Sequence, residues 1–185
     1  GISSWSLKKK NETLVVDNNS FWFSGGPFLG FFGEESVTLT LPEDLSGTLE
    51  LDVQNSAGSA VIAGDFATLN VEINAGDVQI EGVIDDLELS VNAGSARLAA
   101  RDVRTLDVDV SAGSVRGNIT GTAPETSTFS VSAGDINLTM PDVAYRVSSD
   151  VSLGDADIDL NTDSSAPRSI ALDVSAGDIT LRRGE

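Results

Sequence analysis

The chain has 185 residues, and its 29 acidic and 11 basic residues give a formal charge of −18. This charge repels phosphate backbones, so we expect no nucleic acid partner. The sequence contains neither Cys nor His, which excludes disulfides, thiolate nucleophiles, imidazole bases and conventional zinc sites. We therefore expect no catalytic, metal-binding or cofactor-binding residues, and a protein that is not an enzyme.

Residues 1–46 are expected to form N-terminal strands and an aromatic capping loop. Glu12–Asp17 and Ser36–Leu41 have the alternation of β-strands. Asn18–Glu35 between them holds six of the ten aromatic residues. Large exposed apolar patches are rare, so we expect this loop to cover the first coil of the region that follows. In the alternative, Trp22 and Phe28 stay exposed and contact a partner or a bilayer.

Residues 47–185 repeat one short phrase: a polar residue, a small residue, Gly, then Asp or Ser. Successive glycines are 18, 18, 19, 21, 20 and 23 residues apart, a spacing typical of stacked solenoid coils. The expected structural turns of the coils lie at Gly58, Gly76, Gly94, Gly113, Gly134, Gly154 and Gly177.

Apolar and polar residues alternate on both sides of each glycine, which predicts one strand before the turn and one after it. Like strands of successive coils should pair in parallel. The sequence therefore predicts an all-β, right-handed, single-domain β-solenoid (β-helix) with about seven coils of roughly 18–23 residues. An antiparallel meander is the alternative. Gly117 interrupts the aliphatic pattern of the fourth coil, which predicts a β-bulge there.

The turns need glycine because a side chain at this sharp bend would collide with the neighbouring coil. The residue after the glycine is Asp77, Asp135, Asp155 or Asp178 in four of the turns. We expect these carboxylates to accept hydrogen bonds at the turn. A column of Ca²⁺ ligands is the less favoured alternative, because Ser interrupts the series.

The segment Val37–Asp44 (VTLTLPED), followed by serial [SN]-A-G-[DS] turns, resembles a bacterial family of adhesin domains of unknown function. Some relatives in that family are surface proteins of envelope-stress systems. The resemblance covers about residues 12–183 and implies no catalytic residues. It implies an extracytoplasmic location at the cell envelope, and we expect a membrane anchor, if there is one, in a segment preceding Gly1.

Two groups of charged side chains are candidate interaction surfaces. The strand before the turn places an acidic group outward in several coils, which suits a cationic partner; solubility explains the same acidity. Two arginines occupy equivalent positions in consecutive coils and suit a carboxylate, or they neutralise nearby acids. These candidates are Glu72, Asp109, Asp150 and Asp173, and Arg97 and Arg116.

These features predict a non-enzymatic β-solenoid that serves as an adhesion, interaction or envelope-sensing surface. Its expected partner is an envelope protein, a glycan or a cationic peptide, and we expect a monomer or a weak homo-oligomer. A carbohydrate-active solenoid is one alternative, with Glu88, Asp107, Asp109, Arg97 and Arg116 as its cleft. A self-assembly module that pairs through the C-terminal coil, Asp173–Arg183, is the other.

Overall fold

The computed structural model describes residues 5–10, 13–18 and 46–184 and divides into two compact units, Gly1–Leu39 and Thr40–Glu185. In the first unit, β1 (Trp5–Lys10) and β2 (Thr13–Asn18) form an antiparallel pair. Strand β2 confirms the strand predicted at Glu12–Asp17. The sequence analysis missed β1, whose run of lysines hides the alternation of a strand. The predicted strand Ser36–Leu41 and the aromatic loop lie outside the described residues.

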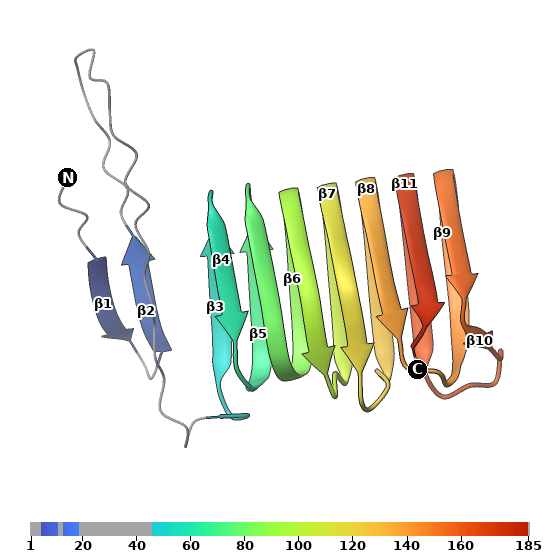
Figure 1. The fold of residues 1–185 in the computed structure, drawn as a ribbon, viewed down its shortest axis with the longest axis horizontal. Coiled ribbons are helices and arrows are strands. Elements are labelled where there is room, and N and C mark those ends of the chain that lie inside the picture. The colour runs from blue at the N-terminus through green and yellow to red at the C-terminus, as the bar shows by residue number, and fades with distance from the viewer. Residues whose placement is uncertain (1–4, 11–12, 19–45, 185) are drawn as a thin grey trace, which may run out of the picture. The chain divides into compact units, whose positions relative to one another are not determined.

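The second unit is a β-solenoid of about six turns, which confirms the predicted fold class. Every strand pair in its described part is parallel, so the meander alternative is wrong. Figure 1 shows the strands stacked side by side along one direction. They are β3 (Glu50–Asn55), β4 (Ser59–Ala63), β5 (Phe66–Ile73), β6 (Asp77–Arg101), β7 (Thr105–Thr120), β8 (Thr126–Met140), β9 (Ala144–Asp159), β10 (Asn161–Thr162) and β11 (Ser169–Arg183).

Each coil has two layers joined by the repeated glycine turn, which we call the motif corner. The segment before the corner belongs to the pre-corner layer, and the segment after it belongs to the post-corner layer. Thus β3 and β5 are pre-corner strands and β4 is a post-corner strand, while the longer strands β6 to β9 and β11 pass through the corner and are paired on both sides of it. Outward side chains of the two layers therefore face opposite sides of the coil.

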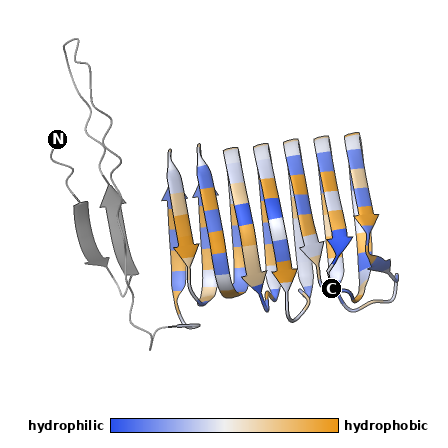
Figure 2. Cartoon of the chain, viewed as in Figure 1, coloured by the Kyte–Doolittle hydropathy of each residue, from blue (hydrophilic) through white to orange (hydrophobic). Residues whose placement is uncertain are grey.

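Aliphatic columns fill the space between the two layers. Hydrophobic and polar residues alternate along the strands in Figure 2, as predicted. The register aligns equivalent positions, so that Leu69, Leu87 and Leu106 lie over one another and are at most 2% exposed. The core is thus a stack of similar side chains, one set for each coil.

The motif corner requires glycine for two reasons. Gly76 has a φ of +113°, which is in the region that side chains avoid. A Cβ added to Gly76 would also collide with the carbonyl oxygen of Gly58 in the preceding coil. Gly58 itself has a φ of +95°, but a Cβ there would meet nothing within 4 Å. The predicted collision is therefore confirmed for Gly76, where the added Cβ would meet the preceding coil.

A second glycine column, at the opposite end of the coil, was not predicted. Gly64 and Gly82 both have a φ near +150°, and a Cβ on Gly82 would collide with the carbonyl oxygen of Gly64. In the next coil Asp102 takes a φ of +56°, and its carboxylate accepts a hydrogen bond from the Thr122 backbone N–H at 2.8 Å. The 18-residue spacing of Gly64 and Gly82 was the available signal.

The bulge predicted at Gly117 is wrong. Gly117 pairs with Leu98 on one side and Leu138 on the other, and the register runs unbroken through the neighbouring residues. A Cβ on Gly117 would collide with the carbonyl oxygen of Leu98. The glycine therefore permits a close approach of two backbones, and Ile119 continues the buried series at 1% exposure.

The last two coils are stacked in the reverse of their sequence order. Strand β11 lies between β8 and β9 and pairs with both, and Figure 1 shows β9 at the end of the stack. The C-terminal coil Asp173–Arg183 is thus internal. The prediction that this coil offers a free edge for self-assembly is therefore wrong.

The side chains of the two coils explain this order. Strand β11 supplies a full aliphatic set, including Leu172 at 4% exposure. The residue of β9 that pairs with Leu172 is Ser149, which is exposed. Burying a hydroxyl without a partner costs about 1–3 kcal/mol, and exposing a leucine forfeits a similar amount. The coil with the polar residue is therefore more stable at the end, where Ser149 meets water.

Candidate functional site: the acidic pre-corner face

The outward positions of the pre-corner layer carry carboxylates in most coils. Register aligns them in columns, such as Gln54, Glu72, Ser90, Asp109, Ser130, Asp173 and Asp150. Arg146 is the basic residue at these outward positions within residues 46–184. The acidic face, as we use the term, consists of Glu50, Asp52, Glu72, Asp86, Glu88, Asp107, Asp109, Asp150 and Asp173.

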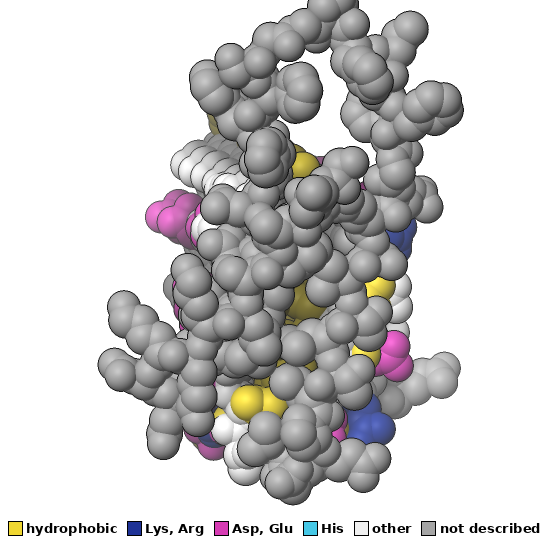
Figure 3. Space-filling view, turned by 90° about the vertical axis from the view of Figure 1, so that its left-hand side faces the viewer, with side chains coloured by type: hydrophobic (Ala, Val, Ile, Leu, Met, Phe, Trp, Pro, Cys, Tyr) yellow, Lys and Arg dark blue, Asp and Glu magenta, His cyan; other side chains and the backbone are white. Residues whose placement is uncertain are grey.

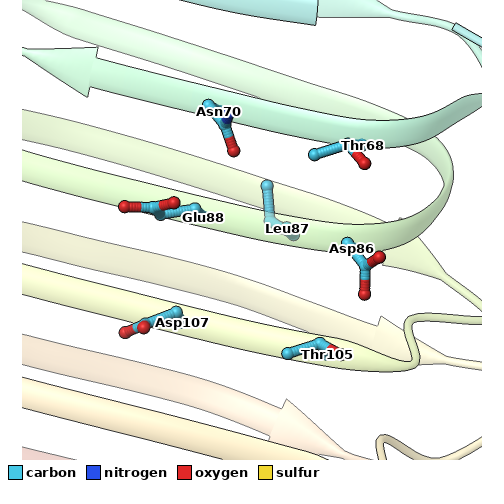
Figure 4. A pocket seen from close by; sticks show the side chains of 7 residues that line it. All are labelled: Thr68, Asn70, Asp86, Leu87, Glu88, Thr105 and Asp107. Atoms are coloured by element: carbon cyan, nitrogen blue, oxygen red, sulfur yellow. The ribbon is translucent and has the colours of Figure 1, made fainter. Parts of the chain in front are cut away.

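A shallow hollow of about 190 Å³ lies on this face. Figure 4 shows its side chains on three neighbouring strands, with Glu88 and Asp107 on adjacent strands. The hollow contains carboxylates, hydroxyls, an amide and one aliphatic side chain. Its lining residues are Thr68, Asn70, Asp86, Leu87, Glu88, Thr105 and Asp107.

The acidic face has few internal partners. Asn70 donates a hydrogen bond to Asp52 at 2.7 Å, and Gln54 donates one to Glu72 at 2.7 Å. The ion pairs among residues 46–184 join Arg104 to Asp85 and Asp86, Arg182 to Asp157, and Arg183 to Asp159. Of the acidic face, Asp86 takes part in one of these pairs, with Arg104 at 2.6 Å. The other carboxylates of the face are not neutralised by a cationic side chain within this part of the chain.

Like charge and partial burial affect one of these groups directly. Burial raises the pKa of the Asp107 carboxyl above its ordinary value, and the nearby Asp109 carboxylate raises it further. Both effects disfavour the ionised form of Asp107. A cation close to this carboxyl would oppose the shift, so the electrostatics of the site favour a positively charged ligand.

The structure aligns the predicted acidic residues on this face. Glu72, Asp109, Asp173 and Asp150 share one column, in which Asp173 and Asp150 are direct neighbours and serines separate the others. The sequence analysis did not select Thr68, Asn70 and Thr105 as site residues. The available signal was the repeat register. All three residues occupy outward positions of the pre-corner layer, directly beside acidic residues of the neighbouring coil. Trp22 and Phe28 lie outside the described residues.

The predicted arginines lie elsewhere. Arg97 and Arg116 are register partners in the post-corner layer, and they line a different hollow from Glu88 and Asp107. The motif corner turns the chain between the two groups. The five-residue cleft expected for a carbohydrate-active solenoid is therefore not assembled.

The carboxylates at the motif corner link neighbouring coils. Asp178 accepts a hydrogen bond from the Asp155 backbone N–H at 3.0 Å, and Asp77 accepts one from the Ser95 hydroxyl. Asp135, Asp178 and Asp155 occupy consecutive rungs. Within residues 46–184, no three acidic side chains are arranged to hold a metal ion. Asp77 and Asp178 thus act as hydrogen-bond acceptors at the turn, as expected.

In the space-filling view of Figure 3, which looks along the stack, Asp and Glu side chains lie at the outline of the solenoid and hydrophobic ones appear nearer its centre. This agrees with a tube whose interior is apolar. No helix within the described residues is long and apolar enough to span a membrane.

A comparison with protein-family models identifies the family of this chain. A model described as Toastrack DUF4097 matches residues 4–184. The chain belongs to the Toastrack DUF4097 family. No curated protein and no solved structure matches the chain significantly. The family is one of unknown function, so the function of this Toastrack chain has to be inferred from the residues on its own surface.

Proposed function

We propose that this Toastrack protein is a non-enzymatic interaction module of the cell envelope, and that its acidic face binds cationic partners such as basic peptide segments. The observation that carries the proposal is the set of aligned carboxylates on one layer, of which Asp86 alone pairs with a cationic side chain among residues 46–184. Like charges stacked one rung apart destabilise a sheet. A cationic ligand relieves that repulsion when it binds. The envelope location rests on the family resemblance of the sequence.

The geometry favours an extended ligand. Glu88 and Asp107 are direct register partners, as are Asp173 and Asp150, so the carboxylates of each pair are separated by the strand spacing of about 4.8 Å. Those of one strand lie two residues apart, as Asp107 and Asp109 do. Alternate side chains of an extended peptide have a similar repeat of about 6.6–7 Å. A peptide with repeated Lys or Arg can therefore pair with several carboxylates at once. Multiple weak ion pairs give salt-sensitive binding.

The test is titration of the protein with a lysine decapeptide by isothermal calorimetry at low and high salt. We expect binding that weakens with salt, and at least about a tenfold loss in a Glu88→Gln, Asp107→Asn, Asp109→Asn variant. The matched control is Glu81→Gln, Asp135→Asn, Asp155→Asn, which removes the same charge at exposed positions away from this face. Equal losses in both variants, or no binding by the parent protein, would overturn the proposal.

A neutral glycan is the second candidate ligand. The hollow in Figure 4 combines the Asn70 amide, the Thr68 and Thr105 hydroxyls and the carboxylates of Asp86, Glu88 and Asp107. This mixture of donors and acceptors suits the hydroxyls of a sugar. Binding of an uncharged oligosaccharide that is insensitive to salt and lost in Asn70→Ala would favour this candidate over the peptide.

A further inference from the structure

We propose that Arg97 and Arg116 form a binding site for a doubly charged oxyanion, a phosphate group, in the post-corner layer. This site lies in the opposite layer from the acidic face and has the opposite charge. It does not depend on the proposed function. The two arginines are register partners on adjacent strands, so their backbones are about 4.8 Å apart.

The environment of the two arginines differs from that of Arg182 and Arg183 in β11. Arg182 and Arg183 each pair with a carboxylate, at 2.6 and 2.9 Å. Arg97 and Arg116 are exposed, and no carboxylate within residues 46–184 lies within 4.0 Å of either guanidinium. The polar contact of Arg116 is a hydrogen bond from its guanidinium to the Ser114 hydroxyl at 3.3 Å. Two like charges thus stand side by side in a protein of net charge −18.

A shallow hollow of about 290 Å³ lies between these side chains. Ala99 and Gly117 contribute little side-chain volume to it, and Gln79 adds an amide donor to its lining. Its lining residues are Gln79, Ile80, Arg97, Leu98, Ala99, Arg116 and Gly117. The hollow therefore offers N–H donors around a space large enough for a small anion.

The charge balance favours phosphate over carboxylate. A single guanidinium satisfies one carboxylate through two parallel hydrogen bonds. A phosphate monoester carries about −1.5 to −2 charges and three acceptor oxygens, which matches two guanidiniums one rung apart. Because adjacent cations repel each other, the bound anion also removes an unfavourable interaction of the free protein.

The experiment measures binding of inorganic phosphate and of glucose 6-phosphate by calorimetry, with acetate as the comparison anion. We expect both phosphates to bind at least about tenfold more tightly than acetate, and Arg97→Gln or Arg116→Gln to weaken phosphate binding about tenfold or more. The matched control is Arg101→Gln. Arg101 is exposed on the same strand and lies outside the hollow, so we expect less than a twofold change.

Thermal unfolding provides a second readout. A ligand that binds the native state raises its stability, so phosphate should raise the melting temperature of the parent and of the Arg101→Gln variant. It should not raise that of Arg97→Gln. Without phosphate, Arg97→Gln should melt at or slightly above the parent temperature, because a like-charge contact is removed.

Three outcomes would overturn the proposal: acetate binding as tightly as phosphate, an equal loss in the Arg101→Gln control, or no loss in either hollow variant. Glucose 6-phosphate binding more tightly than inorganic phosphate would support the site and identify a phosphorylated sugar as the better ligand. Failure of the lysine peptide to bind would leave these outcomes unchanged, since the peptide test concerns the other layer.

Discussion

Val174 of β11 and Val151 of β9 are register partners on adjacent strands, yet Val174 is 1% exposed and Val151 is 37% exposed. Both belong to the same position of the repeat. Their environments differ because β11 is inserted between β8 and β9, so that β9 has a neighbour on one side along most of its length. The order of stacking, and not the repeat position, decides which valine is in the core.

This relationship predicts unequal effects of one substitution at two equivalent positions. Val174→Ala should lower the free energy of unfolding by about 2 kcal/mol, since it removes buried methyl groups and leaves a cavity. Val151→Ala should cost less than about 1 kcal/mol, because part of that side chain is already in water. Urea unfolding of the two variants measures both values. If the coils were stacked in sequence order, the larger loss would move to Val151.

Ser127 provides a second test of the core. Its side chain is 1% exposed, and its hydroxyl has no hydrogen-bond partner among the described residues. Ser127 lies in the aliphatic column between Leu106 and Ile170. A buried hydroxyl without a partner costs about 1–3 kcal/mol, so Ser127→Ala should raise the free energy of unfolding by about 1 kcal/mol.

The control for this prediction is Ser148→Ala, at an exposed serine of β9, which should change stability by less than about 0.5 kcal/mol. Equilibrium unfolding in urea is again the measurement. A loss of stability in Ser127→Ala would show that the hydroxyl has a partner in solution, such as a buried water.

The motif corner gives a pair of glycines with similar backbone angles and different surroundings. Gly58→Ala places a Cβ in open space, so its cost should be the backbone strain of about 1–2 kcal/mol. Gly76→Ala adds a collision with the Gly58 carbonyl oxygen, and should cost at least about 2 kcal/mol more or prevent folding. Melting temperatures of the two purified variants, or soluble yield if Gly76→Ala does not fold, compare them. Equal losses would show that backbone strain alone decides the effect.

Much of the solenoid could be predicted from the sequence because its signals are local and repeated. The Ala-Gly-Asp turns and the flanking alternation specify the two strands of each coil, and the aligned acidic column follows from that register. The order of the last two coils depends on which of two segments distant in sequence, β9 or β11, supplies the more aliphatic set of side chains. Ser149 in an otherwise aliphatic position, and the 23-residue step from Gly154 to Gly177, were signals for the exchange of β9 and β11.

The hollows were harder to predict, for a similar reason. Thr68, Asn70 and Thr105 carry no motif, and they become neighbours of Glu88 and Asp107 only through the parallel register. The separation of Arg97 and Arg116 from those carboxylates follows from the corner between the two layers. The sequence pattern gives the spacing of the charged residues. The layer on which each of them lies can be assigned only when the positions of both turns of the coil are known.

Tyr145 links the stability of the fold to alkaline pH. It is the only tyrosine of the chain and is 0% exposed, and its hydroxyl donates a hydrogen bond to the Pro141 carbonyl oxygen at 3.0 Å. Burial raises the pKa of its phenol to about 12, against an ordinary value of 10.0. The native state therefore holds the phenolic proton more tightly than the unfolded state does. Stability is unaffected below about pH 10 and falls as the pH rises from 10 to 12.

A pKa shift of this size corresponds to a loss of about 2–3 kcal/mol between pH 10 and pH 12. The absorbance of the phenolate reports this single group directly, and we expect its midpoint near pH 12 in the native protein and near 10 in urea. Tyr145→Phe should cost about 1 kcal/mol at pH 7 through the lost hydrogen bond, and should remove this part of the alkaline decline. A native midpoint near 10, or the same decline in Tyr145→Phe, would show that Tyr145 ionises without penalty and that other groups cause the loss.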